Sequence, residues 1–188
     1  LIPSAFASAG TTRLTTQQTL ADGLIYRNTI SKHPSAGRLE SFSFELEPDS
    51  PVYPIMVQSA GTIYGAATIN RAISYAESLG CHVVGGINSD FFTLGNGIPN
   101  GISIEDGVYK SSPEGYHAIS MVDGELRLST SPQVEITVTN ERTGASVSLT
   151  HLNKWRNSAG GLYLFNEDFS TVSTHTDAAG GRMIRMQV

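Results

Sequence analysis

A carboxylate set among apolar residues is the first feature of this sequence that points to chemistry. Asp90 follows the apolar run 81–87 and the polar pair Asn88 and Ser89, and two phenylalanines come directly after it. A buried carboxylate is costly unless it is paired or hydrogen-bonded, and its pKa is then often perturbed. We therefore expect a strand over 81–87 to deliver Asp90 to a functional site. The alternative is a local turn in which Asn88 and Asp90 accept hydrogen bonds from nearby backbone N–H groups.

Other kinds of reactive site find little support in the sequence. The five histidines lack the spacing of a transition-metal site, and Cys81 is the single cysteine, so we expect neither a metal centre nor a disulfide within the chain. We find no phosphate-binding loop and no nucleophile elbow, and we expect no cofactor. The sequence leaves open whether a divalent ion is required.

Length and charge narrow the class of protein. The chain has 188 residues, of which 39% are hydrophobic, and a net charge of -5. A chain of this length can bury one substantial core, so the sequence predicts a single domain over 11–188. The acidic balance argues against nucleic acid as a partner. No stretch approaches the roughly 20 apolar residues of a membrane helix, so we expect no membrane span.

The N-terminal residues have the composition of an export signal. An apolar start, Pro3 and the small-residue pattern Ala7-Ser8-Ala9 fit the end of a cleaved signal peptide. We therefore interpret 1–10 as a signal-peptide remnant and expect a secreted or cell-surface protein. The alternative is an ordinary flexible N-terminus rich in Ala and Ser.

The remaining pattern predicts one helix and many hairpins. Ile69, Ile73 and Ala76 share one face at helical spacing, so we expect an amphipathic helix over 62–79 packed on a sheet. The expected strands alternate or are apolar and are bounded by Gly, Asp, Asn or Pro; they cover 20–30, 39–46, 81–87, 102–104, 108–110, 117–122, 125–129, 134–139, 145–150, 161–165, 170–176 and 182–188. The fold class we expect is α+β, mostly antiparallel sheet built from hairpins with one main helix.

Two ordered segments carry a family resemblance. The first, 86–107, contains GINSDFF, GIPNG and IEDG; the second, 152–176, contains LNKWRN and GLYLFN. Together they resemble the phosphodiester glycosidase family, which includes uncovering-enzyme-like N-acetylglucosamine-1-phosphodiester α-N-acetylglucosaminidases. Ser89 and Asp90 stand where many members have two glycines, and Asp is a variant among bacterial forms. Members usually continue into a second half, so we expect this chain to be an N-terminal portion of a longer domain.

The resemblance implies a hydrolase that cleaves sugar-1-phosphodiesters in glycan or cell-wall polymer metabolism, with a phosphorylated glycan as its partner. It implies catalytic roles for Asp90, as the carboxylate that stabilises the sugar cation or orients water, and for Asn88, as an amide donor. The substrate-binding residues it implies are Gly97, Gly101, Phe92, Asn153 and Arg156.

Each of these interpretations has an alternative. Phe91 and Phe92 are also typical core residues, and Arg156 is also explained as a solvated surface charge. A non-catalytic carbohydrate-binding or surface-interaction module that retains the fold is the second functional hypothesis. A strand over 182–188 would leave an exposed edge, through which we expect possible self-association.

Overall fold

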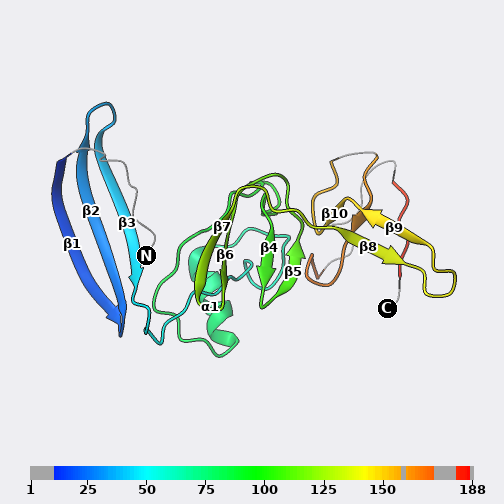
Figure 1. Cartoon of the computed structure of the whole chain (residues 1–188), viewed down its shortest axis with the longest axis horizontal. Coiled ribbons are helices and arrows are strands. Elements are labelled where there is room, and N and C mark those ends of the chain that lie inside the picture. Colours follow the sequence, from blue (N-terminus) through cyan, green and yellow to red (C-terminus); the bar gives the residue numbers. More distant parts are fainter. Residues whose placement is uncertain (1–10, 158–159, 172–180, 187–188) are drawn as a thin grey trace. The chain divides into compact units, whose positions relative to one another are not determined.

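The computed structural model describes residues 11–157, 160–171 and 181–186. The chain divides into two compact units, Leu1–Pro54 and Ile55–Val188. Most of the regular structure is antiparallel strand, and the described residues contain one short helix (Figure 1). The expected hairpin architecture with a single helix is therefore confirmed at this coarse level. The predicted signal-peptide remnant at 1–10 lies outside the described residues, and the single domain over 11–188 stays a prediction.

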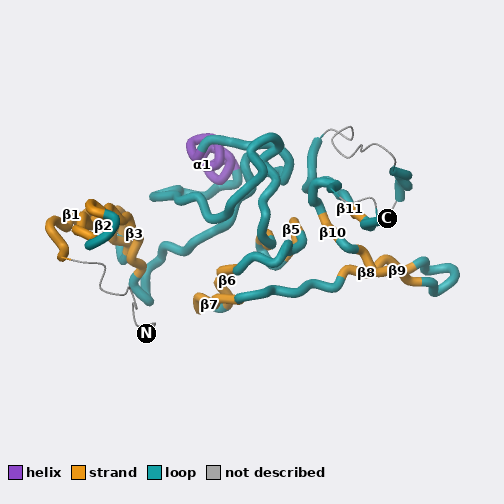
Figure 2. The backbone as a smooth tube through the Cα atoms, turned by 90° about the horizontal axis from the view of Figure 1, so that it is seen from above, coloured by secondary structure: helices purple, strands orange, loops and turns teal. Residues whose placement is uncertain are grey.

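The first unit is a three-stranded antiparallel sheet in the order β1-β2-β3 (Figure 2). Its strands are β1 (Thr11–Ala21), β2 (Leu24–His33) and β3 (Gly37–Leu46). A turn at Gly23, where φ is 68°, ends β1 and begins β2, because an Asp-Gly pair suits the tight hairpin turn. The single strand expected over 20–30 is therefore wrong in its bounds, and the strand expected over 39–46 is confirmed as most of β3.

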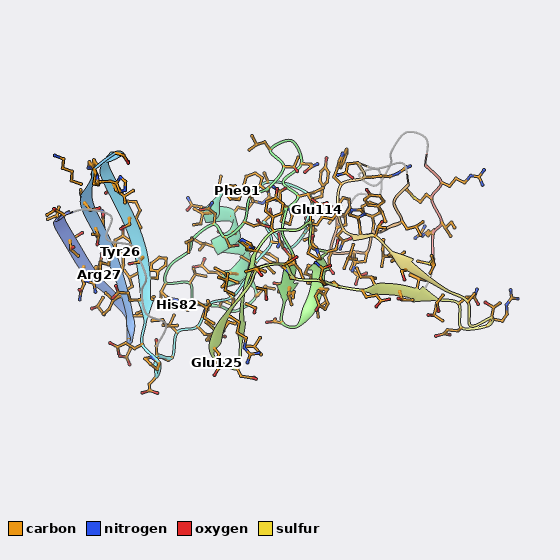
Figure 3. The ribbon with its side chains drawn as sticks, turned by 45° about the horizontal axis from the view of Figure 1, so that its top comes forward. Tyr26, Arg27, His82, Phe91, Glu114 and Glu125 are labelled. Atoms are coloured by element: carbon orange, nitrogen blue, oxygen red, sulfur yellow. The ribbon has the colours of Figure 1, made fainter. Side chains whose placement is uncertain are left out.

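The two faces of this sheet differ in polarity, because side chains alternate along each strand. On one face the Tyr26 ring stacks on that of Phe42 at a centroid distance of 6.4 Å, and it lies 5.9 Å from the Phe44 ring at a tilt of 52°. On the other face Arg27, the next residue, forms a 2.7 Å ion pair with Glu45 (Figure 3). The sequence pattern predicts this alternation, but the apolar face is not buried, because Phe42 and Phe44 are 61% and 39% exposed.

The second unit contains the helix α1 (Ile69–Ser78), which begins seven residues later than the sequence predicts. Gly65 has a φ of 114°, which is incompatible with a helix, and Thr68 then caps α1 by accepting a hydrogen bond from the Arg71 N–H. At the other end Gly80 has a φ of 92°, which is typical of a glycine just past a helix C-terminus.

Three hairpins and one short parallel pair supply the other strands. The hairpins pair β4 (Ser103–Glu105) with β5 (Val108–Ser111), β6 (Ala118–Val122) with β7 (Glu125–Ser129), and β8 (Ile136–Thr139) with β9 (Ser146–Leu149). The parallel pair joins β10 (His151–Leu152) to β11 (Tyr163–Leu164). Asp106-Gly107 and Asp123-Gly124 form the turns of the first two hairpins, with left-handed backbones at all four residues.

Some expected strands do not form. Residues 81–89 are neither helix nor strand. Residues 181–186 likewise contain no strand, so the edge expected over 182–188 is absent from its described part. The expected strand over 170–176 lies mostly outside the described residues. Self-association through the C-terminal edge stays a prediction.

The core of the second unit is small and lies close to the candidate site. Ile63, Ile98 and Phe169 are almost completely buried, and Tyr64 and Phe165 pack against them. Backbone hydrogen bonds run from Ile63 N–H to the Asp168 carbonyl and from Tyr64 N–H to the Phe169 carbonyl. The core therefore joins three parts of the chain, around residues 63, 98 and 169.

Candidate active site

A narrow loop follows the acidic residue that the sequence analysis singles out. Thr93 N–H donates to the Ile98 carbonyl at 3.0 Å, and Asn100 N–H donates to the Phe91 carbonyl at 2.8 Å. Phe92 lies opposite Pro99 between these two bonds. Residues 91–100 therefore form a short irregular hairpin, which we call the site loop.

Asp90 closes the base of the site loop with its side chain. Its Oδ2 accepts a 2.7 Å hydrogen bond from the Gly101 N–H, eleven residues further along the chain. Its Oδ1 accepts no hydrogen bond from the described part of the chain, and the residue as a whole is partly buried. One carboxylate oxygen is thus bonded to the backbone, but the donor lies eleven residues away, so this is not the local turn considered as the alternative. The other oxygen is available to a ligand.

Lys154 holds the returning side of the site loop from within the protein. Its side chain is 1% exposed, and its Nζ donates to three successive carbonyls: those of Pro99 at 2.6 Å, Asn100 at 3.1 Å and Gly101 at 2.8 Å. An ammonium has three N–H donors. The described carbonyls therefore use all of them.

Burial sets the electrostatics of this lysine. Removal from water disfavours the charged form and lowers the pKa of Lys154 to about 8 from an ordinary 10.5, while the negative charges of Glu114 and Asp90 oppose this lowering. The neighbouring His151, stacked 4.3 Å from Tyr163, also has a lowered pKa, mainly through burial. Glu114 is labelled in Figure 3.

The lowered pKa of Lys154 predicts a pH dependence of stability. A folded state that binds a proton less tightly than the unfolded state gains stability as the pH rises between the two pKa values. We therefore expect Lys154 to raise the free energy of unfolding as the pH increases from about 8 to about 10.5. Urea denaturation of the wild type and of Lys154→Met across this range measures the effect. An equal pH slope in both proteins would contradict it.

Asn153 connects three segments beneath the site loop. It is 0% exposed, and its Nδ2 donates to the Lys110 carbonyl at 2.8 Å and to Asn166 Oδ1 at 2.6 Å. Its Oδ1 accepts from the Asn166 N–H at 3.2 Å. The φ of 51° at this residue is one that Asn tolerates better than most residues. The side chain predicted to bind substrate is therefore directed at the protein, and contact with substrate stays a prediction.

A second polar cluster lies beside this junction. Lys110 forms a 2.7 Å ion pair with Asp168, and the hydrogen bond from Lys110 to Asp168 raises the pKa of the lysine. Burial raises the pKa of Glu105, which lies in the same small pocket. The residues lining this pocket are Gln58, Gly61, Ile63, Glu105, Lys110 and Asp168. None of the residues predicted for the site is among them.

The predicted glycines allow close approach to the protein itself. A Cβ at Gly97, where φ is 74°, would overlap the backbone of Gly65 and Ala66. A Cβ at Gly101 would lie 2.8 Å from Asp90 Oδ2. Both positions therefore need glycine for the packing of the site loop, and their predicted contact with substrate remains untested.

The other predicted residues lie at different exposures. Asn88 is exposed, and Phe92 and Phe91 are 42% and 77% exposed. The Arg156 guanidinium lies against Gly181, where an added Cβ would overlap it. Of the predicted residues, the structure thus brings Asp90 and Gly101 into direct contact.

Lys154 is the residue that the sequence analysis does not single out. In the sequence it stands between Asn153 and Trp155 near Arg156, a setting typical of a solvated charge. Its carbonyl partners lie 53 to 55 positions away in the chain. Apart from its place in the LNKWRN segment, the sequence contains no signal for this role.

The structure and the comparisons with known proteins add three findings. The described residues contain no group of three or more His, Cys, Asp or Glu side chains placed to hold a metal ion. No described helix is long and apolar enough to cross a membrane. No family model matches the chain, and no curated protein or solved structure matches it significantly.

Proposed function

We propose that this chain is part of an exported phosphodiester glycosidase that hydrolyses sugar-1-phosphodiesters. The observation that carries the proposal is the arrangement at Asp90: one carboxylate oxygen is anchored by the Gly101 N–H and the other is available. An anchored carboxylate has a defined orientation, which a catalytic group needs. The resemblance of 86–107 and 152–176 to that family gives the reaction class.

The chemistry fits a site with one carboxylate. Ordinary glycosidases pair two carboxyl groups, one of which protonates the leaving oxygen. In a sugar-1-phosphodiester the leaving group is a phosphate monoester, a weakly basic anion, so little acid assistance is needed at that oxygen. Asp90 then stabilises positive charge at the anomeric carbon or orients water, and the exposed amide of Asn88 donates to a sugar hydroxyl or a phosphate oxygen.

The remaining parts of the proposal concern the surroundings of Asp90. Phe92, partly exposed in the site loop, supplies an apolar surface for the sugar ring. Arg156 supplies a guanidinium for the phosphate, whose two oxygens it matches in geometry. The same proposal includes three further expectations. The apolar face of α1 packs against a sheet, the protein is exported from the cell, and it acts in cell-wall or glycan metabolism.

Substitution of Asp90 tests the reaction. We expect Asp90→Asn to lower the turnover of an N-acetylglucosamine-1-phosphodiester by roughly 10²-fold or more, because the amide carries no negative charge. The amide oxygen still accepts from the Gly101 N–H, so the thermal midpoint should change little. Release of N-acetylglucosamine and thermal unfolding are the two measurements.

A matched control is Asp123→Asn, in the exposed turn between β6 and β7, where φ is 52°. This exchange removes the same charge from a position that Asn also tolerates. Full activity in the control with loss in Asp90→Asn supports the proposal. Unchanged turnover in Asp90→Asn would refute the catalytic role.

The second candidate is a carbohydrate-binding module without catalysis. The observation in its favour is the exposure of Phe91 and Phe92 beside the polar Asn88, because exposed aromatic rings next to hydrogen-bonding groups suit saccharides. Figure 3 labels Phe91 in the site loop. Saccharide binding that persists in Asp90→Asn, together with no turnover by the wild type, would favour this candidate.

A further inference from the structure

We propose that Lys154 is a positioning residue: its ammonium fixes the backbone of 99–101 and thereby holds the Gly101 N–H on Asp90. The expected effect of Lys154 on turnover rests on the proposed function. Its expected effect on the backbone of the site loop does not. The juxtaposition that carries the proposal is one buried Nζ within 3.1 Å of three successive carbonyl oxygens.

The peptide unit between Asn100 and Gly101 is held at both ends. Its carbonyl oxygen accepts from Lys154 Nζ at 3.1 Å, and its N–H donates to Asp90 Oδ2 at 2.7 Å. Because a peptide unit is planar, rotation that moves the oxygen also moves the N–H. Lys154 therefore reaches Asp90 through a single rigid plane.

A substitution at Gly101 or a change at Lys154 is expected to move this peptide plane. Gly101 is buried, and a Cβ there would lie 2.8 Å from Asp90 Oδ2. A neutral lysine keeps only two N–H donors for three carbonyls, and methionine has none. A buried carbonyl left without a donor is costly. The orientation of Gly101 is thus expected to follow the charge on Lys154.

Burial and the charges around the Lys154 ammonium set the pH at which it loses its proton. Glu114 and Asp90 favour its protonation and burial opposes it, which leaves the pKa at about 8. His151 has a lowered pKa, so it is already neutral where Lys154 titrates. We therefore assign the transition expected near pH 8 at this site to Lys154.

The decisive experiment is a pH titration of the wild-type chain by NMR, which needs no variant to fold. The signals followed are the amide of Gly101 and the Cε of Lys154. We expect both to move together with one midpoint near 8. We also expect the protection factor of the Gly101 amide, which corrects for the rise of intrinsic exchange with pH, to fall at least about 10-fold above that midpoint. A Gly101 signal that stays constant through the Lys154 transition would overturn the proposal.

Two variants separate charge from packing. Lys154→Met keeps most of the apolar stem, and we expect fast exchange of the Gly101 amide at every pH. Lys110→Met is the matched control, because it removes a partly exposed lysine that pairs with Asp168 and donates no hydrogen bond to 99–101. Slow exchange in Lys154→Met, or equally fast exchange in the control, would contradict the inference.

Activity then distinguishes this inference from the proposed function. If the wild type hydrolyses a sugar-1-phosphodiester, we expect Lys154→Met to lower kcat with little change in KM, because it disturbs the carboxylate rather than the binding surface. A wild type without activity whose Gly101 amide still titrates with Lys154 would refute the function and leave the inference standing. An active enzyme in which Lys154→Met changes neither kcat nor the exchange of the Gly101 amide would refute the inference and leave the proposed function standing.

Discussion

Replacing Gly97 by alanine is expected to lower the free energy of unfolding by about 4 kcal/mol. Two costs combine: the φ of 74° disfavours any residue with a Cβ, and the Cβ would overlap the backbone of Gly65 and Ala66. Backbone atoms cannot move aside as a flexible side chain does. Urea denaturation with a linear extrapolation to water measures the difference.

The control lies two residues earlier in the same loop. Gly95 has no atom within 4 Å of the position where a Cβ would stand, so we expect Gly95→Ala to change the free energy of unfolding by no more than about 0.5 kcal/mol. A loss below about 1 kcal/mol in Gly97→Ala would show that the loop adapts. Equal losses in both variants would point to a general sensitivity of the loop.

Gly97 also shows what sequence reasoning about glycine leaves undecided. The type and position of the residue indicate a close approach, which the sequence analysis assigns to a ligand. In the structure the approach is to the backbone of Gly65 and Ala66, and the Gly65 N–H donates to the Asn96 carbonyl at 2.7 Å. Glycine predicts that something lies close by, and only the folded chain identifies it.

Elements that depend on local chemistry were the most predictable. The turns at Asp106-Gly107 and Asp123-Gly124 follow from residues that accept left-handed backbones, and the hairpins around them are confirmed. The strand expected over 81–87 failed, because an apolar run becomes a strand only beside a partner strand, and partners are not encoded locally. The helix began late for a related reason, since Gly65 has a backbone that no helix accommodates.

The candidate site likewise contains one residue that the sequence indicates and one that it does not. Asp90 was found because a carboxylate before two aromatics is unusual in any local setting. Lys154 was not, because its local setting is that of a solvated charge and its burial is created by residues more than 50 positions away. Whether a charged side chain is buried depends on residues far from it in the sequence, so its neighbours in the sequence do not predict its role.

Asn153→Ala is expected to lower the free energy of unfolding by about 4 kcal/mol, as the second large effect. The variant removes three hydrogen bonds at a fully buried position, including the donor to the Lys110 carbonyl. It also places alanine at a φ of 51°. The measurement is again urea denaturation, and Asn157→Ala is the control, since Asn157 is exposed and its side chain accepts one hydrogen bond, from Tyr163.

A second substitution divides this loss into its causes. Asn153→Gly removes the same hydrogen bonds, but glycine adopts the left-handed backbone without strain. We expect it to be more stable than Asn153→Ala by about 1 kcal/mol, and the remaining loss of about 3 kcal/mol measures the buried hydrogen bonds. Full recovery of stability in Asn153→Gly would mean that the residue matters only for its backbone. In that case the hydrogen bonds to Lys110 and Asn166 would not hold the segments together.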